Sequence, residues 1–189
     1  RVSVSTNGTE ANGRTEHSSI SSDGRYVAFA SWADNLITGD TNGSIDVFVR
    51  DLVTGLTSRV SVGSGGIQAN GNSVHLSISA DDRYVVFDSS ASNLGGVDGN
   101  RMADIFVHDR VTGETTRVSN ASDGNGGNMG SILPSISGDG RYVTFASQSV
   151  NLVPGTPSNY FDVFMHDRQT KETTVVSLAT DGSFGNSDS

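Results

Sequence analysis

Short segments in which apolar and polar residues alternate, separated by turn-forming residues, follow one another along the chain. The Asp23-Gly24 pair lies between the first two segments and favours the positive φ angles of a tight hairpin. Thr54-Gly55 marks another turn, after a run rich in β-branched and aromatic residues. The pattern predicts four short antiparallel strands, at residues 17–21, 26–31, 46–51 and 57–62.

This four-strand pattern repeats with a period of 58 residues and without insertions or deletions. The tripeptide Arg-Val-Ser at position 1 returns at positions 59 and 117, and a further copy begins at Val175 and stops. Repetition on this scale marks an array of supersecondary units, each of which cannot bury its apolar face alone.

Apolar residues on both faces of the middle two strands are typical of a propeller blade packed between neighbouring blades. A helical solenoid is excluded, because no stretch has apolar residues at helical spacing over three turns. The expected fold class is therefore all-β, a β-propeller of four-stranded antiparallel blades. The expected content is three complete blades of 58-residue period plus an extra strand.

Residues 1–189 would form a single propeller array. Residues 1–4 would be an orphan outer strand and residues 179–189 a truncated inter-blade loop. Closed propellers have about four to eight blades, so the chain would be a fragment of a longer propeller or half of a homodimeric six-bladed ring. The complete blades are expected at residues 17–62, 75–120 and 133–178.

Three motifs carry a family resemblance. Ser-Ile-Ser-x-Asp-Gly-Arg-Tyr-Val-x-Phe at 19–29, Asp-Val-Phe-Val-x-Asp at 46–51 and Thr-Gly-x-Thr at 54–57 resemble the WD40-like (PD40) repeat of TolB-type β-propellers. Asp82 and Lys171 replace turn glycines in the later copies. The resemblance implies a bacterial protein, periplasmic or secreted, that serves as a protein-interaction scaffold or as an accessory to a hydrolase domain.

Two connections in each unit are long, at residues 5–16 and 32–45 in the first, and strand alternation places both on the same face of the disc. We call this the long-loop face. Long loops on a rigid scaffold commonly carry binding, so ligands and partners are expected there.

The second long loop has oxygen-bearing side chains at alternate positions before a glycine, with an aspartate three residues later. Calcium takes six to eight hard oxygen ligands from flexible loops, and the pattern resembles the short calcium loops of integrin-type propellers. The candidate metal ligands are Thr38, Asp40, Asn42 and Asp46 in the first copy, and Asp98, Asn100 and Asp104 in the second.

A structural interpretation of this loop competes with calcium binding. Asp40 and Asn42 can form an ordinary turn, with Asp46 bracing the start of the next strand. The third copy keeps a single carboxylate, Asp162, so any calcium affinity should fall along the chain. The persistence of the last aspartate in all three copies favours the structural role.

Further candidates for the ligand face are His17, His75 and Trp32. His17 and His75 begin the innermost strands of their blades, and Leu133 replaces them in the third. Two imidazoles can bind a metal or a partner, but no acidic support is evident nearby, so polar lining is favoured. An exposed Trp32 indole could stack on a sugar, although packing beneath the loop is the favoured interpretation.

Composition narrows the function classes. The net charge of −9 disfavours nucleic-acid or anionic-membrane partners, and the absence of cysteine excludes disulfides and thiolate chemistry. No Gly-x-Ser-x-Gly motif is present, and Lys171 is the only lysine, so nucleophile-elbow and P-loop sites are absent.

We therefore predict a non-enzymatic extracytoplasmic propeller with a protein or glycan partner and calcium as a stabilising ion. The alternative is the propeller portion of a larger hydrolase or peptidase.

Overall fold

The computed structural model describes residues 1–96, 99–157 and 160–184, which form three four-stranded antiparallel sheets and no helix. The predicted fold class is confirmed. The first sheet contains β1 (Thr15–Ile20), β2 (Tyr26–Ser31), β3 (Asp46–Asp51) and β4 (Thr57–Arg59). The second contains β5 (Ser73–Ile78), β6 (Tyr84–Ser89), β7 (Asp104–Asp109) and β8 (Thr115–Arg117). The third contains β9 (Ser131–Ile136), β10 (Tyr142–Ser147), β11 (Asp162–Asp167) and β12 (Thr173–Val175).

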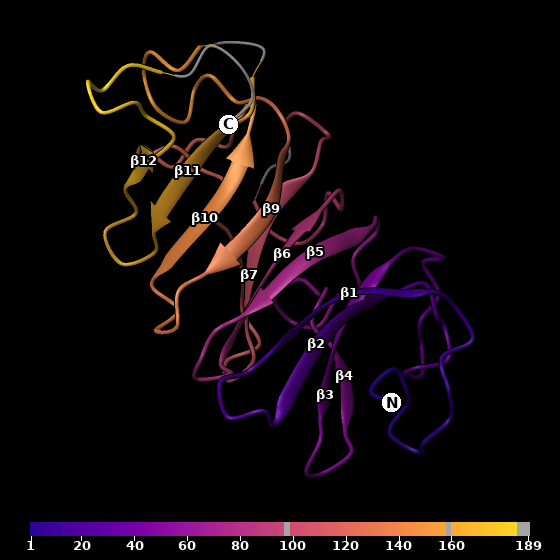
Figure 1. The fold of residues 1–189 in the computed structure, drawn as a ribbon. Coiled ribbons are helices and arrows are strands. Elements are labelled where there is room, and N and C mark those ends of the chain that lie inside the picture. Colours follow the sequence, from indigo (N-terminus) through magenta and orange to yellow (C-terminus); the bar gives the residue numbers. More distant parts are fainter. Residues whose placement is uncertain (97–98, 158–159, 185–189) are drawn as a thin grey trace.

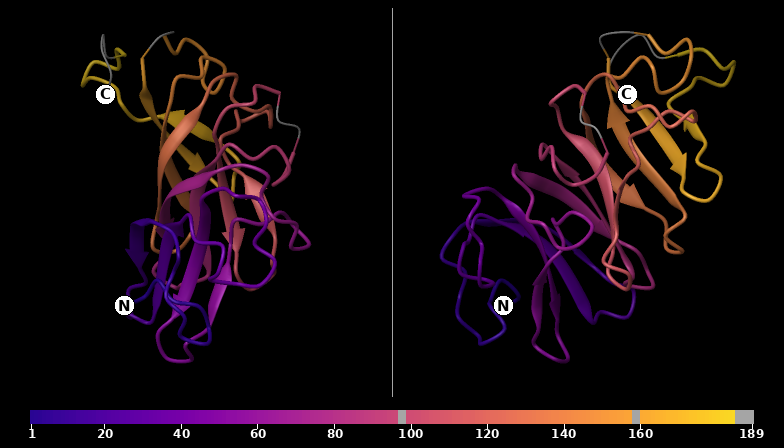
Figure 2. Two further views of the ribbon diagram at one scale, coloured as in Figure 1. Left: turned by 90° about the vertical axis from the view of Figure 1, so that its right-hand side faces the viewer. Right: turned by 180° about the vertical axis from the view of Figure 1, so that it is seen from behind.

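The three sheets follow one another as the blades of an arc, with the first and third blades at opposite ends of the array (Figures 1 and 2). Within each sheet the strands are paired in chain order. The first strand of the middle blade, β5, contacts both β1 and β9, and these three strands form the inner edge of the arc.

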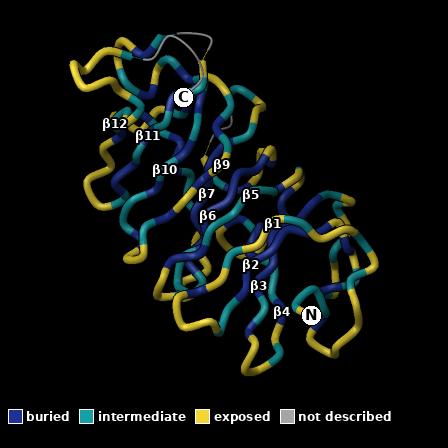
Figure 3. The backbone as a smooth tube through the Cα atoms, viewed as in Figure 1, coloured by how far each residue is buried: buried dark blue, intermediate teal, exposed yellow. Residues whose placement is uncertain are grey.

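Apolar residues of adjacent blades form the core. Each blade contains a pair of stacked phenylalanines, with ring centroids 5.8–6.1 Å apart, on its second and third strands. The seams bury β-branched residues with aromatic residues of the next blade: Val49 shares one core cluster with Phe87, and Val107 shares another with Phe145. Figure 3 shows the middle strands buried and the connecting loops exposed. Stacking therefore supplies the burial that no blade achieves alone.

The second and third strands of the first blade lie at their predicted residues, whereas the outer strand is shorter than predicted. It ends at Arg59 because the backbone N–H of Val47 donates a hydrogen bond to the hydroxyl of Ser61 (3.1 Å). This bond replaces a backbone–backbone hydrogen bond between the two strands. Residues 1–4 contain only an isolated bridge, from Val4 to Glu10. Equivalent bridges follow the outer strand of every blade.

The inner strand of each blade carries a β-bulge near its start. In β1 the register shifts between Glu16 and Ser18, and His17 adopts a φ of 46°. Leu133 adopts a φ of 56° at the equivalent place in β9. Bulges change the direction of side chains at the rims of sheets. The repeated bulge therefore sets the direction of the side chain at this position of the inner strand.

Candidate binding surface on the long-loop face

A pair of asparagines ties the two long connections of each blade together. In the first blade the Asn12 amide donates to Asn35 Oδ1 (3.0 Å), and Asn35 Nδ2 donates to the Glu10 carbonyl (2.8 Å). These bonds recur at the repeat period, so they hold the long-loop face as a rigid platform. The equivalent pairs are Asn70 with Asn93 and Asn128 with Asn151.

The predicted ligands Asp40 and Asp46 converge on an arginine. Nη1 of Arg59 lies 3.4 Å from Asp40 and 3.2 Å from Asp46, and the three side chains are at most 8% exposed. Burial, together with the charge of Asp46, raises the pKa of the Asp40 carboxyl, while Arg59 and Gln68 oppose this rise. The guanidinium therefore supplies the positive charge that two buried carboxylates need.

The other predicted ligands of this loop differ in their placement. Asn42 donates Nδ2 to Asp46 (3.1 Å), and its Oδ1 accepts the amide of Ser44 (3.0 Å). Thr38 is exposed and lines a different depression. The loop oxygens are thus engaged with protein donors, an arrangement that fits an arginine better than Ca²⁺. Calcium ligation stays a prediction.

The second copy repeats part of this cluster. Asp104 accepts Ser119 Oγ (2.7 Å) and lies 3.4 Å from Nη1 of Arg117, while Asn100 donates to the Gly127 carbonyl (2.7 Å). Asp98 lies outside the described residues. Asp104 therefore keeps the hydroxyl and arginine contacts of its counterpart in the first blade.

The third copy keeps only the aspartate and its serine. Asp162 Oδ1 accepts Ser177 Oγ (2.9 Å), whereas Val175 and Thr156 occupy the places of the arginine and the second carboxylate. Asp162 Oδ2 is buried and has no hydrogen-bond partner within the described residues. The arginine and the second acidic residue are thus both absent from the third copy.

Two methionines border a hollow between the second and third blades on this face. The hollow has a volume of about 520 Å³. Met102 and Met129 are 42% and 36% exposed, and Asn100 holds the backbone around them by donating to the Met129 carbonyl (3.3 Å) and accepting the Met102 amide (2.8 Å). Flexible, polarizable side chains on a fixed backbone suit a protein-contact surface. These methionines are not among the candidate residues predicted from the sequence.

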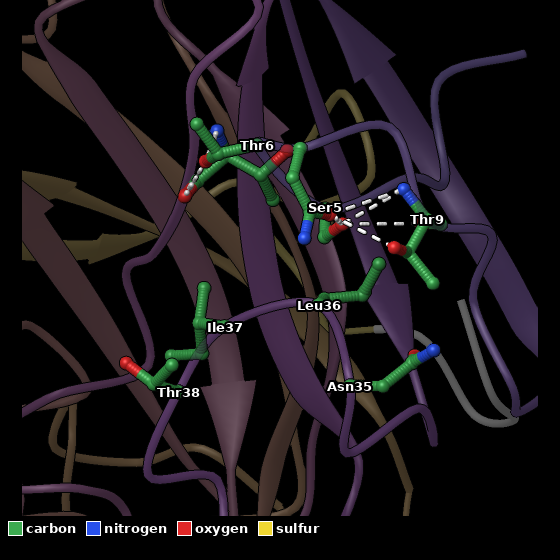
Figure 4. A pocket seen from close by; sticks show the side chains of 9 residues that line it. Ser5, Thr6, Thr9, Asn35, Leu36, Ile37 and Thr38 are labelled. Atoms are coloured by element: carbon green, nitrogen blue, oxygen red, sulfur yellow. Dashed lines mark hydrogen bonds between the residues drawn. The ribbon is translucent and has the colours of Figure 1, made fainter.

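A second depression, of about 640 Å³, lies against the first blade (Figure 4). The N-terminal connection forms one wall, where Ser5 and Thr9 are hydrogen-bonded, and Leu36, Ile37 and Thr38 form the other. Thr57 of β4 also lines it. This mixture of hydroxyl and aliphatic groups provides a shallow amphipathic surface.

The structure brings His17 and His75 together and adds a residue that sequence reasoning missed. Their ring centroids lie 4.6 Å apart, and His75 Nδ1 lies 2.7 Å from Asp88 Oδ2. Acidic support is therefore present, contrary to expectation. The available signal was Asp88 itself, which stands where the other copies have Ala30 and Ala146.

Trp32 is 46% exposed and does not belong to the core cluster of the first blade. Strand alternation explains this difference from the favoured interpretation. Ser31 and Ala33, on either side, point inward and are buried, so the indole points outward. Phe29, Leu36 and other residues already fill the core beneath the loop.

The opposite face is built from tight hairpins held by ion pairs. Arg25 Nη2 lies 2.7 Å from Asp51, and the Val53 amide donates to the same carboxylate (2.8 Å). The hydrogen bond from Arg25 is the main cause that holds the pKa of Asp51 well below its ordinary value. The other two blades repeat this pair as Arg83 with Asp109 and Arg141 with Asp167.

Comparison with known proteins shows a shared fold at low sequence identity. No family model and no curated protein match the sequence. TolB from Agrobacterium tumefaciens aligns with a TM-score of 0.54 at 17% identity, over 86% of this chain and 48% of that one. TolB from Acinetobacter baumannii aligns at 0.53 and 18%, over 88% and 32%. The β-propeller domain of the Trilobed protease from Pyrococcus furiosus aligns at 0.54 and 11%, over 86% and 41%.

This chain therefore spans less than half the length of each of these three proteins. At such identities the likeness establishes the architecture alone. No helix in the described ranges is long and apolar enough to cross a membrane.

Proposed function

We propose that this chain, which has the fold of the TolB-like β-propellers, is a non-enzymatic binding or scaffold module whose long-loop face contacts a protein. The observation that carries the proposal is the hollow bordered by the exposed side chains of Met102 and Met129. Methionine is enriched at protein interfaces, and a backbone held in place lowers the ordering cost of binding. The net charge of −9 favours a partner with a basic surface.

The repeated framework supports a scaffold role. The residues that recur in every blade hold turns and loops, as the asparagine pairs and the hairpin ion pairs show. The methionines occur only around the second and third blades. Binding residues that differ between copies on an unchanged scaffold are what a specific contact surface requires.

A periplasmic or secreted location in a bacterium is part of the proposal, and it rests on the family resemblance. Fractionation of producing cells tests it. A chain confined to the cytoplasmic fraction would contradict it.

The similarity to the propeller domain of the Trilobed protease supports a second candidate, the propeller portion of a larger hydrolase or peptidase. An in-frame hydrolase domain in the complete gene would favour this candidate. A reading frame that contains repeats alone would exclude it.

Site-specific photo-crosslinking tests the first candidate. A crosslinking amino acid at position 102, in cells that naturally produce the protein, should capture one discrete protein. The same group at Val111, which is 76% exposed on the opposite face, should not. Equal capture from both positions would contradict the proposed face, and capture of glycan alone would replace the protein partner with a saccharide.

The captured partner then allows a quantitative test. Met102→Asp should weaken its affinity by about tenfold or more, because a charge would be desolvated in an apolar contact. Val111→Asp is the matched control and should leave the affinity within about twofold. An unchanged affinity for the Met102 variant would overturn the proposal.

A further inference from the structure

The inner edge of the first two blades holds a histidine pair that the proposed binding face does not use. His17 lies on β1 and His75 on β5, and these two strands contact each other (Figure 1). The bulge in β1 places His17 at a positive φ of 46°, a conformation that is costly for a residue other than glycine. The backbone is therefore distorted at the position where the two imidazoles meet.

We propose that His17 and His75 bind a divalent transition-metal ion such as Zn²⁺, with Asp88 as the residue that positions His75. The two ring centroids lie 4.6 Å apart and the ring planes are inclined by 60°. Two imidazoles that bind one tetrahedral ion through nitrogen at about 2.0–2.1 Å have centroids about 5 Å apart. The observed centroid spacing is close to this value.

Asp88 is the carboxylate partner that orients His75. Its Oδ2 lies 2.7 Å from His75 Nδ1 and also accepts the Leu133 amide (3.1 Å), while Oδ1 accepts the His75 amide (3.2 Å). Histidines that bind metals usually donate their second ring N–H to a carboxylate, which fixes the ring and its tautomer. With Nδ1–H directed at Asp88, Nε2 of His75 keeps its lone pair for the ion.

The Asp88 carboxylate is 5% exposed and its oxygens are engaged, so it acts through His75 and is not itself a ligand. Among the described residues, no group of three or more histidine, aspartate or glutamate side chains is arranged to hold a metal. The ion would therefore bind two imidazoles and complete its coordination with water. Imidazole ligands favour Zn²⁺, Ni²⁺ and Cu²⁺ over Ca²⁺ and Mg²⁺.

The other two histidines of the chain provide an internal control. His108 and His166 are buried, and their Nδ1 atoms bond to Thr115 (2.8 Å) and Thr173 (2.9 Å). Burial lowers the pKa of His166 to about 4, so this ring stays neutral near pH 7. Their NMR signals should not change when Zn²⁺ binds at the inner edge.

Titration of the chain with Zn²⁺, followed by imidazole NMR and calorimetry, tests the site. The signals of His17 and His75 should shift together and saturate, while those of His108 and His166 stay fixed. Absence of saturable binding at millimolar Zn²⁺ would overturn the proposal. Saturation without shifts at His17 and His75 would overturn it equally.

Two variants separate ligation from positioning. His17→Ala, at an exposed position, should weaken binding by at least about tenfold, since one of two ligands is lost. Asp88→Asn should weaken it by about 10–100-fold while the same two imidazole signals still shift. An unchanged affinity in His17→Ala would refute the metal site, and an unchanged affinity in Asp88→Asn would refute the positioning role.

Leu133→His tests the site by gain of function. Leu133 occupies the equivalent bulge position, is 55% exposed, and bonds Asp88 through its amide. A third imidazole at this place should tighten Zn²⁺ binding by about tenfold or more. This variant remains informative if a loss-of-function variant fails to fold, and unchanged affinity would count against the proposed location.

Discussion

The first and third blades share a framework but differ in the contacts of the equivalent buried aspartate. In the first, Asp46 lies beside Asp40 and both contact Arg59. In the third, Asp162 has neither an arginine nor a second acid, because Val175 and Thr156 stand at those positions. A serine hydroxyl bonds the aspartate in both blades. The serine contact therefore belongs to the framework, while the ion pair is an optional addition.

The joint loss of arginine and acid has a physical reason. A buried carboxylate without a countercharge is costly, and a buried guanidinium without a carboxylate is costly as well. Replacing Arg59 alone would leave two buried carboxylates, Asp40 and Asp46, without a cation, whereas replacing Asp40 as well removes one of the two. The third blade shows this double replacement in natural sequence.

The largest expected effect comes from breaking the pair in the first blade. Arg59→Val should lower the free energy of unfolding by about 3–5 kcal/mol, because it leaves two buried carboxylates without a cation. Urea unfolding at pH 7 measures this value. A loss below about 1 kcal/mol would show that the arginine does not neutralise the loop.

The double variant Asp40→Thr with Arg59→Val copies the third blade and is the matched control. It should recover part of the stability lost by Arg59→Val, because it removes one of the two carboxylates left without a cation and only Asp46 stays buried with its serine contact. Losses that simply add would contradict the coupling and would place the effect in packing alone.

Local signals predicted much of this fold. Asp-Gly and Thr-Gly turns with β-branched runs placed β2 and β3 of the first blade correctly, because both signals act within a few residues. The end of β4 was missed, since it depends on Ser61 accepting an amide from the neighbouring strand. Neither composition nor period reveals a side chain that replaces a ladder bond.

The candidate sites were less predictable because they depend on contacts across strands and blades. Arg59 belongs to the next sequence copy, yet it neutralises the loop that precedes it. Asp88 supports His75 across a bulge that shifts the register, so a regular ladder would not pair them in this way. In both cases the useful signal was a change at one position between copies.

Lowering the pH should affect the stability contributions of the two faces of the blades differently. Hydrogen bonds from arginine lower the pKa values of Asp51, Asp109 and Asp167 in the folded state. Such groups stabilise the fold above the ordinary aspartate pKa of about 3.9, and this contribution is lost as pH falls toward the lower folded-state values. The pKa of Asp40 is raised in the folded state, so its ionisation at higher pH lowers stability and its protonation in acid relieves this cost.

Melting temperatures between pH 7 and pH 2 test this difference. The wild type should lose stability below about pH 4. The triple variant Asp51→Asn, Asp109→Asn and Asp167→Asn should be less stable at pH 7 and should lose less on acidification. Parallel curves for the two proteins would show that these hairpin pairs do not cause the acid sensitivity.

A smaller effect is expected at the seams. The guanidinium of Arg110 lies 4.1 Å from the ring centre of Tyr26 in the first blade, and Arg168 makes the same contact with Tyr84. The first blade has Leu52 at this position. Arg110→Leu should lower the free energy of unfolding by about 0.5–2 kcal/mol, because a cation–π contact between blades is lost. Leu52→Ala is the control and should change it by less than about 0.5 kcal/mol; equal effects would assign the loss to surface packing.

The smallest expected effect is that of calcium on the first-blade loop. If Arg59 is the cation of this loop, millimolar Ca²⁺ should leave the melting temperature where chelator leaves it, because Asp40 and Asp46 already contact the guanidinium. A true site at a calcium concentration one hundred times its Kd would add about 2.7 kcal/mol, a clearly measurable rise. Asp40→Asn separates the two outcomes: a calcium-dependent rise in the wild type that this variant abolishes would establish a metal site. Such a result would make the difference between the first and third blades one of metal binding, with the arginine displaced when calcium binds.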